Sequence, residues 1–186
     1  DVHYVKPGDH VITCLSVFCG HCEQCVTGHL SLCGEDEVNR GPEEEPRLSQ
    51  YGQSLEQFAR LGSFAEMMLV HEHAVVKIRE DMPSAQAALI GCGVTTGIGA
   101  VIHTAKVEPG ATVAVIGCGG IGLSTINGAA IAGASRIIAV DMVASKLELA
   151  RKFGATDVVD ASDGDAVATV SYTHLLAHET LDNLVL

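Results

Sequence analysis

The chain has 186 residues, a formal net charge of −12, 47% hydrophobic residues and 18% charged residues. This length is enough for one large domain or two small ones, and the composition is typical of a globular protein rather than a disordered one. The acidic excess argues against nucleic acid and against an anionic membrane as partners, because both favour a basic protein surface.

The first ten residues contain no basic segment followed by an apolar run. No signal peptide is therefore expected, and a reducing, cytoplasmic location is predicted. Two windows without charged residues, 82–105 and 109–135, have the length of membrane spans. Glycine clusters interrupt both windows and the stretch AKVEPGA between them has turn chemistry, so buried elements of an α/β protein are favoured.

The N-terminal third is expected to be all-β. Residues 9–18 (DHVITCLSVF) are predicted to form a strand, and residues 62–78 to contain further strands. The polar, acidic residues 34–47 are predicted to form a solvated loop, and the chain from Ser84 onward is predicted to be α/β.

A cluster of cysteines follows the first predicted strand, with the spacing C-x2-C-x2-C-x7-C. Its members are Cys19, Cys22, Cys25 and Cys33. Disulfides, a structural metal site and a catalytic metal site all use cysteines. Neighbours two residues apart are badly placed to bridge each other but well placed to converge on one tetrahedral ion. Four thiolates leave no open coordination position, so the pattern predicts a structural zinc site, with His21 and His29 solvated.

A nucleotide-binding pattern lies further along the chain. A β-branched run at residues 113–116 leads into Gly117-x-Gly119-x-x-Gly122, then a helix-compatible segment and a second strand-like run that ends at Asp141. Strand, glycine turn, helix, strand and acid in this order are the fingerprint of a dinucleotide site. The alternative is a glycine-rich strand–helix turn that binds nothing.

The residues of this pattern have distinct expected roles. Gly117 permits the tight turn, Gly119 lets the backbone approach a pyrophosphate, and Gly122 lets the helix pack on the strand. The pyrophosphate is expected at the helix N-terminus. Asp141 is predicted to accept hydrogen bonds from the adenosine ribose and to repel a 2′-phosphate, which favours NAD over NADP. Cys118 is expected to be a small packing residue.

The α/β alternation continues after Asp141. A helix is predicted to start at Ser145 and to end at Gly154, followed by a third strand at residues 157–160. Lys146 can also reach the adenosine ribose, although a solvated helix lysine is the alternative.

The four-cysteine lobe, GCGVTTGIGA, VAVIGCGGIGL and the acid after the second strand together resemble the zinc-dependent medium-chain alcohol dehydrogenases, and more closely their class III-like bacterial members. The resemblance covers roughly residues 1–168. It implies an α/β plus all-β architecture: part of a GroES-like β domain at residues 1–92, then a partial Rossmann coenzyme domain at residues 93–169. Such enzymes transfer a hydride between a small alcohol or aldehyde and NAD, usually as dimers or tetramers.

The resemblance also implies roles for single residues. The four clustered cysteines match structural zinc ligands, and Cys92 matches one ligand of the catalytic zinc. The residues implied to bind the cofactor are Thr96, Gly117, Cys118, Gly119, Gly120, Ile121, Gly122, Asp141 and Lys146. Without the resemblance, Cys92 would be interpreted as a buried core cysteine.

Two features depart from the family pattern. The family's first catalytic cysteine and its Gly-His-Glu motif lie upstream of the segment that VKPGDHVI matches, and this chain begins at Asp1, after them. Since Cys92 alone cannot hold a catalytic zinc, an internal fragment that is inactive alone is expected. A polyol or formaldehyde-adduct dehydrogenase, or a non-catalytic zinc- and NAD-binding module, are the alternatives.

The C-terminal segment, residues 170–186, reads VSYTHLLAHETLDNLVL. Its first six letters resemble a translation of the transposon mosaic-end adapter used in sequencing libraries. These residues are therefore predicted to be a non-native tail, with an ordinary amphipathic helix as the alternative.

Overall fold

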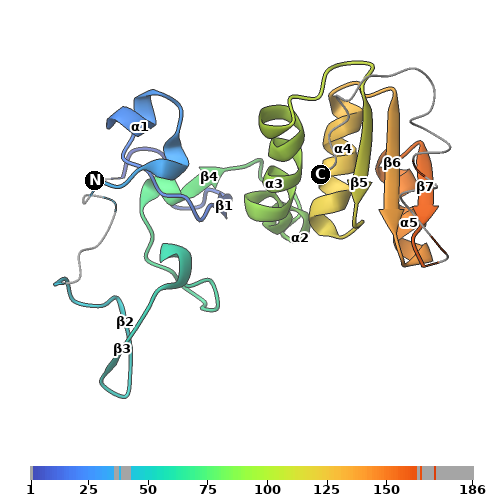
Figure 1. Cartoon of the computed structure of the whole chain (residues 1–186). Helices are drawn as coiled ribbons and strands as arrows, with labels where there is room; N and C mark the ends of the chain where they lie inside the picture. The colour runs from blue at the N-terminus through green and yellow to red at the C-terminus, as the bar shows by residue number, and fades with distance from the viewer. Residues whose placement is uncertain (1, 36–37, 39–42, 163, 165–169, 171–186) are drawn as a thin grey trace. The chain divides into compact units, whose positions relative to one another are not determined.

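A computed structural model describes residues 2–35, 38, 43–162, 164 and 170 of the chain (Figure 1). The chain forms two compact units, Asp1–Gly91 and Cys92–Leu186. The division lies one residue before the boundary expected from the sequence. The predicted non-native tail lies outside the described residues except for Val170, whose side chain packs against a buried cluster of the second unit.

The N-terminal unit contains short elements. Its described strands are β1 (Val11–Thr13), β2 (Leu48–Gln50), β3 (Gln53–Leu55) and β4 (Val75–Lys77). Its helical turns are α1 (Glu23–Val26), η1 (Leu30–Leu32), η2 (Phe58–Arg60), η3 (Glu72–Ala74) and α2 (Ser84–Leu89). β1 pairs antiparallel with β4, and β2 pairs antiparallel with β3. The strands predicted at residues 9–18 and 62–78 are therefore present but much shorter than expected.

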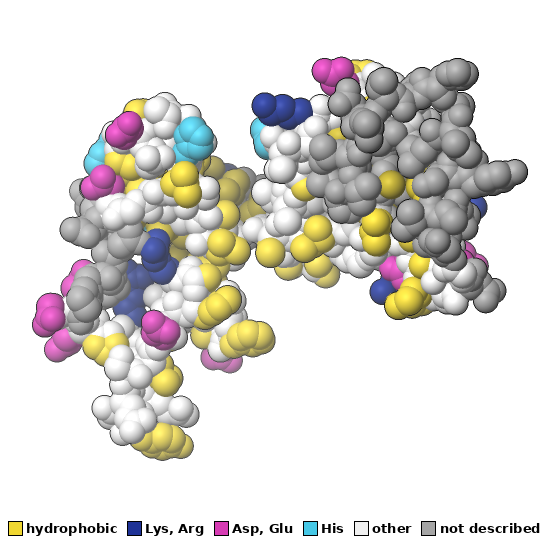
Figure 2. Space-filling view, viewed as in Figure 1, with side chains coloured by type: hydrophobic (Ala, Val, Ile, Leu, Met, Phe, Trp, Pro, Cys, Tyr) yellow, Lys and Arg dark blue, Asp and Glu magenta, His cyan; other side chains and the backbone are white. Residues whose placement is uncertain are grey.

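The N-terminal unit also leaves large apolar side chains in solvent, and Figure 2 shows hydrophobic side chains over its surface. Phe58, Phe64 and Met67 are 88%, 110% and 89% exposed. A small buried cluster forms where β1 leads into the cysteine segment. It consists of Val17, Cys19, Cys25, Val38, Leu61 and Ala74. The cysteines are therefore part of the core of this unit.

The C-terminal unit is regular. The helical segment η4 (Ile90–Val94) spans the division between the units. The elements that follow are α3 (Thr95–Gly99), η5 (Ala100–Thr104), β5 (Thr112–Ile116), α4 (Gly120–Ile131), β6 (Arg136–Asp141), α5 (Ala144–Phe153) and β7 (Asp157–Asp160). The strands form a parallel sheet in the order β5-β6-β7, with α4 and α5 as the crossovers (Figure 1). Gly154 ends α5 in a left-handed conformation, φ 117°, as its sequence position predicts.

The alternation of β6 divides the core of this sheet into two clusters. Ile137 and Ala139 are buried with Ile126 of α4 and Leu147 of α5. The next residues along the strand, such as Ile138, point to the opposite face, where they pack with β7. Because both faces of a parallel strand are covered, the run is continuously apolar rather than alternating, as the sequence RIIAV shows.

The helical stretch Ser84–Thr104 is long and apolar enough to cross a membrane by length and composition, and 17% of the apolar window is buried. This is weak evidence for a span, because core helices of other proteins have the same properties. Part of the stretch packs inside the second unit: a Cβ on Gly97 would lie 2.6 Å from the Ser124 Cβ of α4. The prediction that the stretch does not span a membrane stays a prediction.

Candidate functional site

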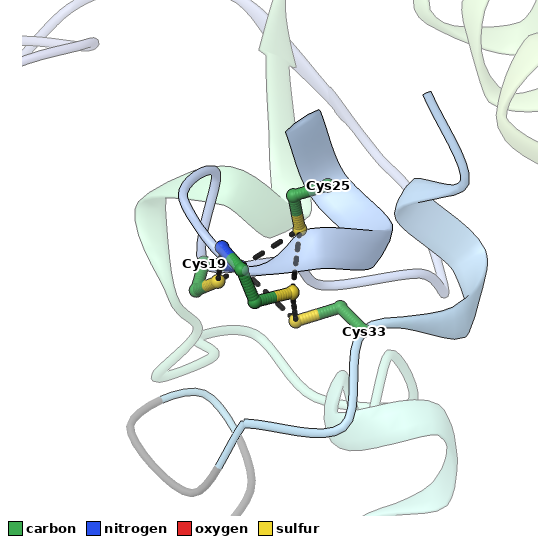
Figure 3. Close-up of side chains that lie close together, drawn as sticks. Cys19, Cys25 and Cys33 are labelled. Carbon is green, nitrogen blue, oxygen red and sulfur yellow. Dashed lines mark hydrogen bonds between the residues drawn. The ribbon is translucent and has the colours of Figure 1, made fainter. Parts of the chain in front are cut away.

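The four predicted zinc ligands converge on one point in the N-terminal unit. The ligand atoms of Cys19, Cys22, Cys25 and Cys33 all lie within 4.8 Å of one another. Figure 3 shows the side chains of Cys19, Cys25 and Cys33 close together. The Sγ–Sγ distances are 3.5 Å for Cys22–Cys25, 3.8 Å for Cys19–Cys25 and 4.0 Å for Cys22–Cys33. Sulfurs bound tetrahedrally to zinc at about 2.3 Å are about 3.8 Å apart. The geometry therefore fits one tetrahedral zinc ion.

Local backbone structure brings the sulfurs together. Gly20, at φ 93°, turns the chain sharply after Cys19. The N–H of Cys22 then donates to the Cys19 Sγ at 3.3 Å. The N–H of Cys19 donates to the Cys33 Sγ at 3.4 Å, which ties the two ends of the segment together. These N–H groups stabilise negative charge on sulfur, as metal-bound thiolates require.

The ionisation of the cysteines is strongly coupled. The backbone N–H groups of Glu35 and Cys19 lower the pKa of Cys33 to about 7. The N–H of Cys25 lowers the pKa of Cys22, but burial and the neighbouring cysteine sulfurs outweigh it and raise this pKa to about 12. Four thiolates this close repel one another, so a cation is needed before all four can ionise. All seven cysteines of the chain are free thiols, which excludes a disulfide in this arrangement.

Other polar groups near the cluster do not complete a second ligand set. His21 and His29 are exposed, as predicted from the sequence. Within residues 2–35, 38, 43–162, 164 and 170, the four cysteines form the one group of three or more His, Cys, Asp or Glu side chains placed to hold a metal.

The glycine loop of the C-terminal unit has the geometry that its pattern predicts. Gly117 has φ 90° and donates its N–H to the Val140 carbonyl at 2.8 Å. A Cβ on Gly122 would lie 1.8 Å from the Gly117 carbonyl oxygen, so only glycine fits there. A Cβ on Gly119 would meet no atom within 4 Å, so the protein itself leaves the space in front of this residue open.

Helix α4 begins directly after this open space. Gly119 is its N-cap, no side chain caps its N–H groups, and no acidic residue lies in its first turn. An uncapped helix start of this kind attracts an anion, because its N–H groups point outward and the helix dipole is positive there. The open space and the uncapped helix start together fit a pyrophosphate.

Asp141 lies beside the loop at the end of β6. It is 8% exposed, and its Oδ2 accepts the Cys118 N–H at 2.7 Å while its Oδ1 accepts the Val143 N–H at 2.9 Å. The Cys118 N–H, with help from the Val143 N–H and the Lys146 ammonium, holds the pKa of this carboxyl below its usual value. The Lys146 Nζ lies 3.7 Å from Oδ2. The predicted ribose-binding acid and lysine are thus together, and the acid is ionised.

The remaining predicted site residues lie on helical segments of the same unit. Cys118 is 1% exposed, so its side chain packs in the core, and burial raises the pKa of its thiol. Cys92 is exposed on η4 and is not the buried core cysteine of the alternative interpretation. Thr96 is exposed on α3, and Ile121 is 51% exposed in the first turn of α4. The cofactor and catalytic-zinc roles of these residues stay predictions.

Two residues with conspicuous contacts have no signal in the sequence. The His73 Nδ1 lies 2.7 Å from the Phe18 carbonyl oxygen, next to the first cysteine of the cluster. The Glu72 Oε2 accepts the N–H groups of His3 and Tyr4 at 2.8 and 2.9 Å. The partners are separated by 55 to 69 residues, and no local spacing links them.

Comparison with known families agrees with this geometry. Residues 1–80 match the alcohol dehydrogenase GroES-like domain, and residues 120–178 match the zinc-binding dehydrogenase family. The chain belongs to the zinc-dependent medium-chain alcohol dehydrogenases. The predicted family and the predicted combination of a GroES-like part with a partial Rossmann domain are both confirmed.

Individual family members cover most of this chain. It is 46% identical over 165 residues to S-(hydroxymethyl)glutathione dehydrogenase of Escherichia coli O1:K1 / APEC, a match that covers 87% of this chain and 45% of that protein. An alcohol dehydrogenase zinc-binding domain protein from Burkholderia ambifaria has a similar structure, with TM-score 0.79, 34% identity and coverage of 92% of this chain and 48% of that one. Benzyl alcohol dehydrogenase from Acinetobacter calcoaceticus follows at TM-score 0.76 and 36% identity, with coverage of 92% and 47%. The chain thus spans about half the length of these relatives.

Proposed function

We propose that this chain binds zinc and NAD for an oxidoreductase that transfers a hydride between an alcohol and NAD. One observation carries the proposal. The ionised Asp141 is fixed against the glycine loop by the Cys118 N–H, directly beside the open, uncapped start of α4. This juxtaposition supplies an anion site and a ribose acceptor, the two halves of an adenine dinucleotide site.

Each group of this site has a defined task. The N–H groups at the start of α4 bind the pyrophosphate, and Gly119 lets it approach the backbone. Asp141 accepts hydrogen bonds from both ribose hydroxyls and repels a 2′-phosphate, so NAD is preferred to NADP. Lys146 offsets the charge of Asp141 and can donate to a ribose oxygen. Bound NAD would supply the acceptor for the hydride of the alcohol carbon, and the glycine loop, Asp141 and Lys146 would hold its adenosine diphosphate part.

The two expected zinc ions have different tasks. The four clustered cysteines leave no open coordination position, so zinc there holds the loop and performs no chemistry. Cys92 is proposed as one ligand of a catalytic zinc, which would supply Lewis-acid polarisation of the alcohol oxygen. Such a site needs three protein ligands, and Cys92 would supply one of them.

A finer assignment concerns the substrate. The 46% identity to S-(hydroxymethyl)glutathione dehydrogenase supports a formaldehyde–thiol adduct as the alcohol, with a polyol as the alternative. A dimer or tetramer is part of the same proposal. So is a reducing, cytoplasmic location, which the seven free thiols support.

The nucleotide site can be tested without turnover. Titration of the chain with NADH and with NADPH, followed by nucleotide fluorescence, is expected to show tighter NADH binding. Asp141→Asn is expected to weaken NADH binding about 10-fold and to narrow the preference over NADPH, because the charged acceptor is lost. Asp160→Asn is the matched control, since Asp160 pairs with Asp141 in register on the neighbouring strand.

The control should bind NADH within about twofold of the unmodified chain. Absence of NADH binding, or equal loss in the Asp141 and Asp160 variants, would overturn the proposed site. Zinc content is measured on the same samples, and one tightly bound zinc per chain is expected from the cysteine cluster alone.

A further inference from the structure

His73 makes a contact that links the cysteine segment to a distant part of the N-terminal unit. Its Nδ1 lies 2.7 Å from the carbonyl oxygen of Phe18, the residue immediately before the first zinc ligand, Cys19. We propose that His73 is a positioning residue for the zinc site, which acts through the Phe18–Cys19 peptide rather than as a ligand. The inference rests on zinc binding by the four cysteines as proposed above.

The direction of this hydrogen bond follows from its partner. A carbonyl oxygen only accepts, so the His73 Nδ1 carries the proton and donates it. The same ring stacks on the Phe18 ring, with centroids 4.7 Å apart and planes inclined by 11°. His73 therefore holds Phe18 by both its backbone and its side chain.

The ring also lies close to the turn that follows Cys19. A Cβ added to Gly20 would lie 3.9 Å from the His73 Cε1, so the ring faces the open side of this glycine. The turn at Gly20 and the N–H···S bonds to the Cys19 sulfur form at this point. Fixing this peptide limits the directions that the Cys19 Cα–Cβ bond can take, and the N–H···S bond from Cys22 then holds the sulfur.

His73 is itself held in place. Its backbone N–H donates to the His71 Nδ1 at 3.1 Å, and the two rings meet edge to face at a centroid distance of 5.1 Å. The next residue, Ala74, is 2% exposed, and its carbonyl accepts the Cys14 N–H at 2.8 Å. The ring is therefore presented by a fixed turn, η3, that is tied to the strand leading into the cysteines.

Such outer contacts matter because a metal site needs its ligands in place before the ion binds. Loss of a partner that orients a ligand typically costs 10- to 100-fold in metal affinity. The cysteine segment has only the short helical elements α1 and η1 of its own. A contact from outside the segment, such as that of His73 with Phe18, is therefore expected to contribute strongly to its order.

Two substitutions separate the hydrogen bond from the ring stacking. His73→Phe keeps an aromatic ring on Phe18 but removes the donor. His73→Asn loses the ring but places an N–H₂ group close to the position of Nδ1. Zinc-loaded full-length chain is mixed with a chromophoric chelator, and the rate of zinc release is recorded. His73→Phe is expected to release zinc about 10-fold faster than the unmodified chain, and His73→Asn within about threefold of it.

Glu72→Gln is the matched control. Glu72 lies on the same turn but binds the N–H groups of His3 and Tyr4 instead of the cysteine segment. This variant is expected to leave zinc release unchanged, because it loosens the attachment of His3 and Tyr4 and not that of Phe18. Equal acceleration in Glu72→Gln and His73→Phe would mean that general loosening is the cause, and would overturn the inference.

The cobalt-substituted forms give a second readout. Thiolate-to-cobalt absorption bands of four-sulfur coordination are expected in all variants, with weaker cobalt retention in His73→Phe alone. Unchanged zinc and cobalt retention in His73→Phe would refute the positioning role while leaving the zinc site intact. Failure of the unmodified chain to bind zinc through its cysteines would instead refute the proposed zinc site itself.

Discussion

The two units of this chain reach order by different means. In Cys92–Leu186, a parallel sheet and its crossover helices bury a continuous apolar core, in which Ile126, Ile137 and Ala139 are at most 1% exposed. In Asp1–Gly91, each described strand is three residues long, and Cys19 and Cys25 belong to the buried cluster. The N-terminal unit depends on the convergence of its cysteines at one point. The C-terminal unit depends on the burial of apolar side chains that recur along its strands and helices.

This difference predicts different vulnerabilities. A periodic core spreads its stability over many small contacts, so single losses are tolerated or cost only a few kcal/mol. A metal-centred core concentrates its stability in one ion, because metal binding and folding are the same event for small metal-organised segments. The hydrogen bond of His73 to Phe18 adds to that centre but does not replace it.

The largest expected effect is from removal of zinc. A strong chelator should unfold the N-terminal unit and leave the sheet β5-β6-β7 in place, because structural zinc is worth about 10 kcal/mol or more in small domains. Hydrogen exchange measured on peptides from residues 10–78 and 112–160 separates the two responses. Cys25→Ser should reproduce the chelated state without chelator. Simultaneous loss of protection in both peptides would contradict independent stabilisation.

Next in size is a pair of glycine substitutions in the nucleotide loop. Gly122→Ala places a Cβ 1.8 Å from the Gly117 carbonyl and should destabilise the C-terminal unit by about 3 kcal/mol, because two backbone segments must separate. Gly119→Ala meets nothing within 4 Å and has φ −79°, so folding should be unchanged.

NADH binding distinguishes the two glycine variants further. Gly119→Ala should weaken it at least 10-fold, since the new Cβ occupies the space in which the pyrophosphate approaches the backbone. Normal NADH binding by Gly119→Ala, measured by fluorescence titration, would show that the open space is not the pyrophosphate site. Zinc release should be unchanged in both variants, because the substitutions lie outside the N-terminal unit.

A smaller effect is expected where α3 crosses α4. Gly97→Ala brings a Cβ within 2.7 Å of the Ile121 carbonyl and the Thr125 N–H, which should cost about 1–3 kcal/mol. Gly99→Ala, on the same helix, meets no atom within 4 Å and should stabilise by about 0.5 kcal/mol through helix propensity. Urea unfolding, monitored by hydrogen exchange in α4, gives the change in the free energy of unfolding for both variants. Similar behaviour of the two variants would argue against close helix packing at Gly97.

The smallest expected effect is acid sensitivity of the second unit. The Cys118 N–H lowers the folded-state pKa of Asp141 below its unfolded value of about 3.9. The stabilisation is therefore complete above about pH 5 and is lost as the pH falls through the folded-state pKa.

Acid also protonates the zinc thiolates. The contribution of Asp141 to stability must therefore be measured in β6 and not in the whole chain. Hydrogen exchange in β6 between pH 6 and pH 3, corrected for intrinsic rates, is the measurement. Asp141→Asn should flatten this dependence. An identical pH dependence in both proteins would assign the effect to other groups.

Much of both sites was predictable because their signals are local. The spacing of four cysteines within fifteen residues identified a tetrahedral ligand set, and the geometry has the sulfurs within 4.8 Å. The strand, glycine turn and helix around Gly117 follow from residues that are neighbours in the chain. The strands of the N-terminal unit were overestimated, since apolar runs there end in exposed side chains such as Phe64 and Met67 instead of sheet.

What the sequence by itself determined is therefore the chemistry of short segments: the thiol cluster, the glycine turn and the acid that closes the second strand. Only the tertiary structure decided that Asp141 accepts the Cys118 N–H, that Gly97 must be small, and that His73 reaches Phe18 across 55 residues. The physical reason is that spacing along the chain encodes the geometry of one turn or one strand. A hydrogen bond between distant segments depends on how the whole unit packs, and no single segment carries that information.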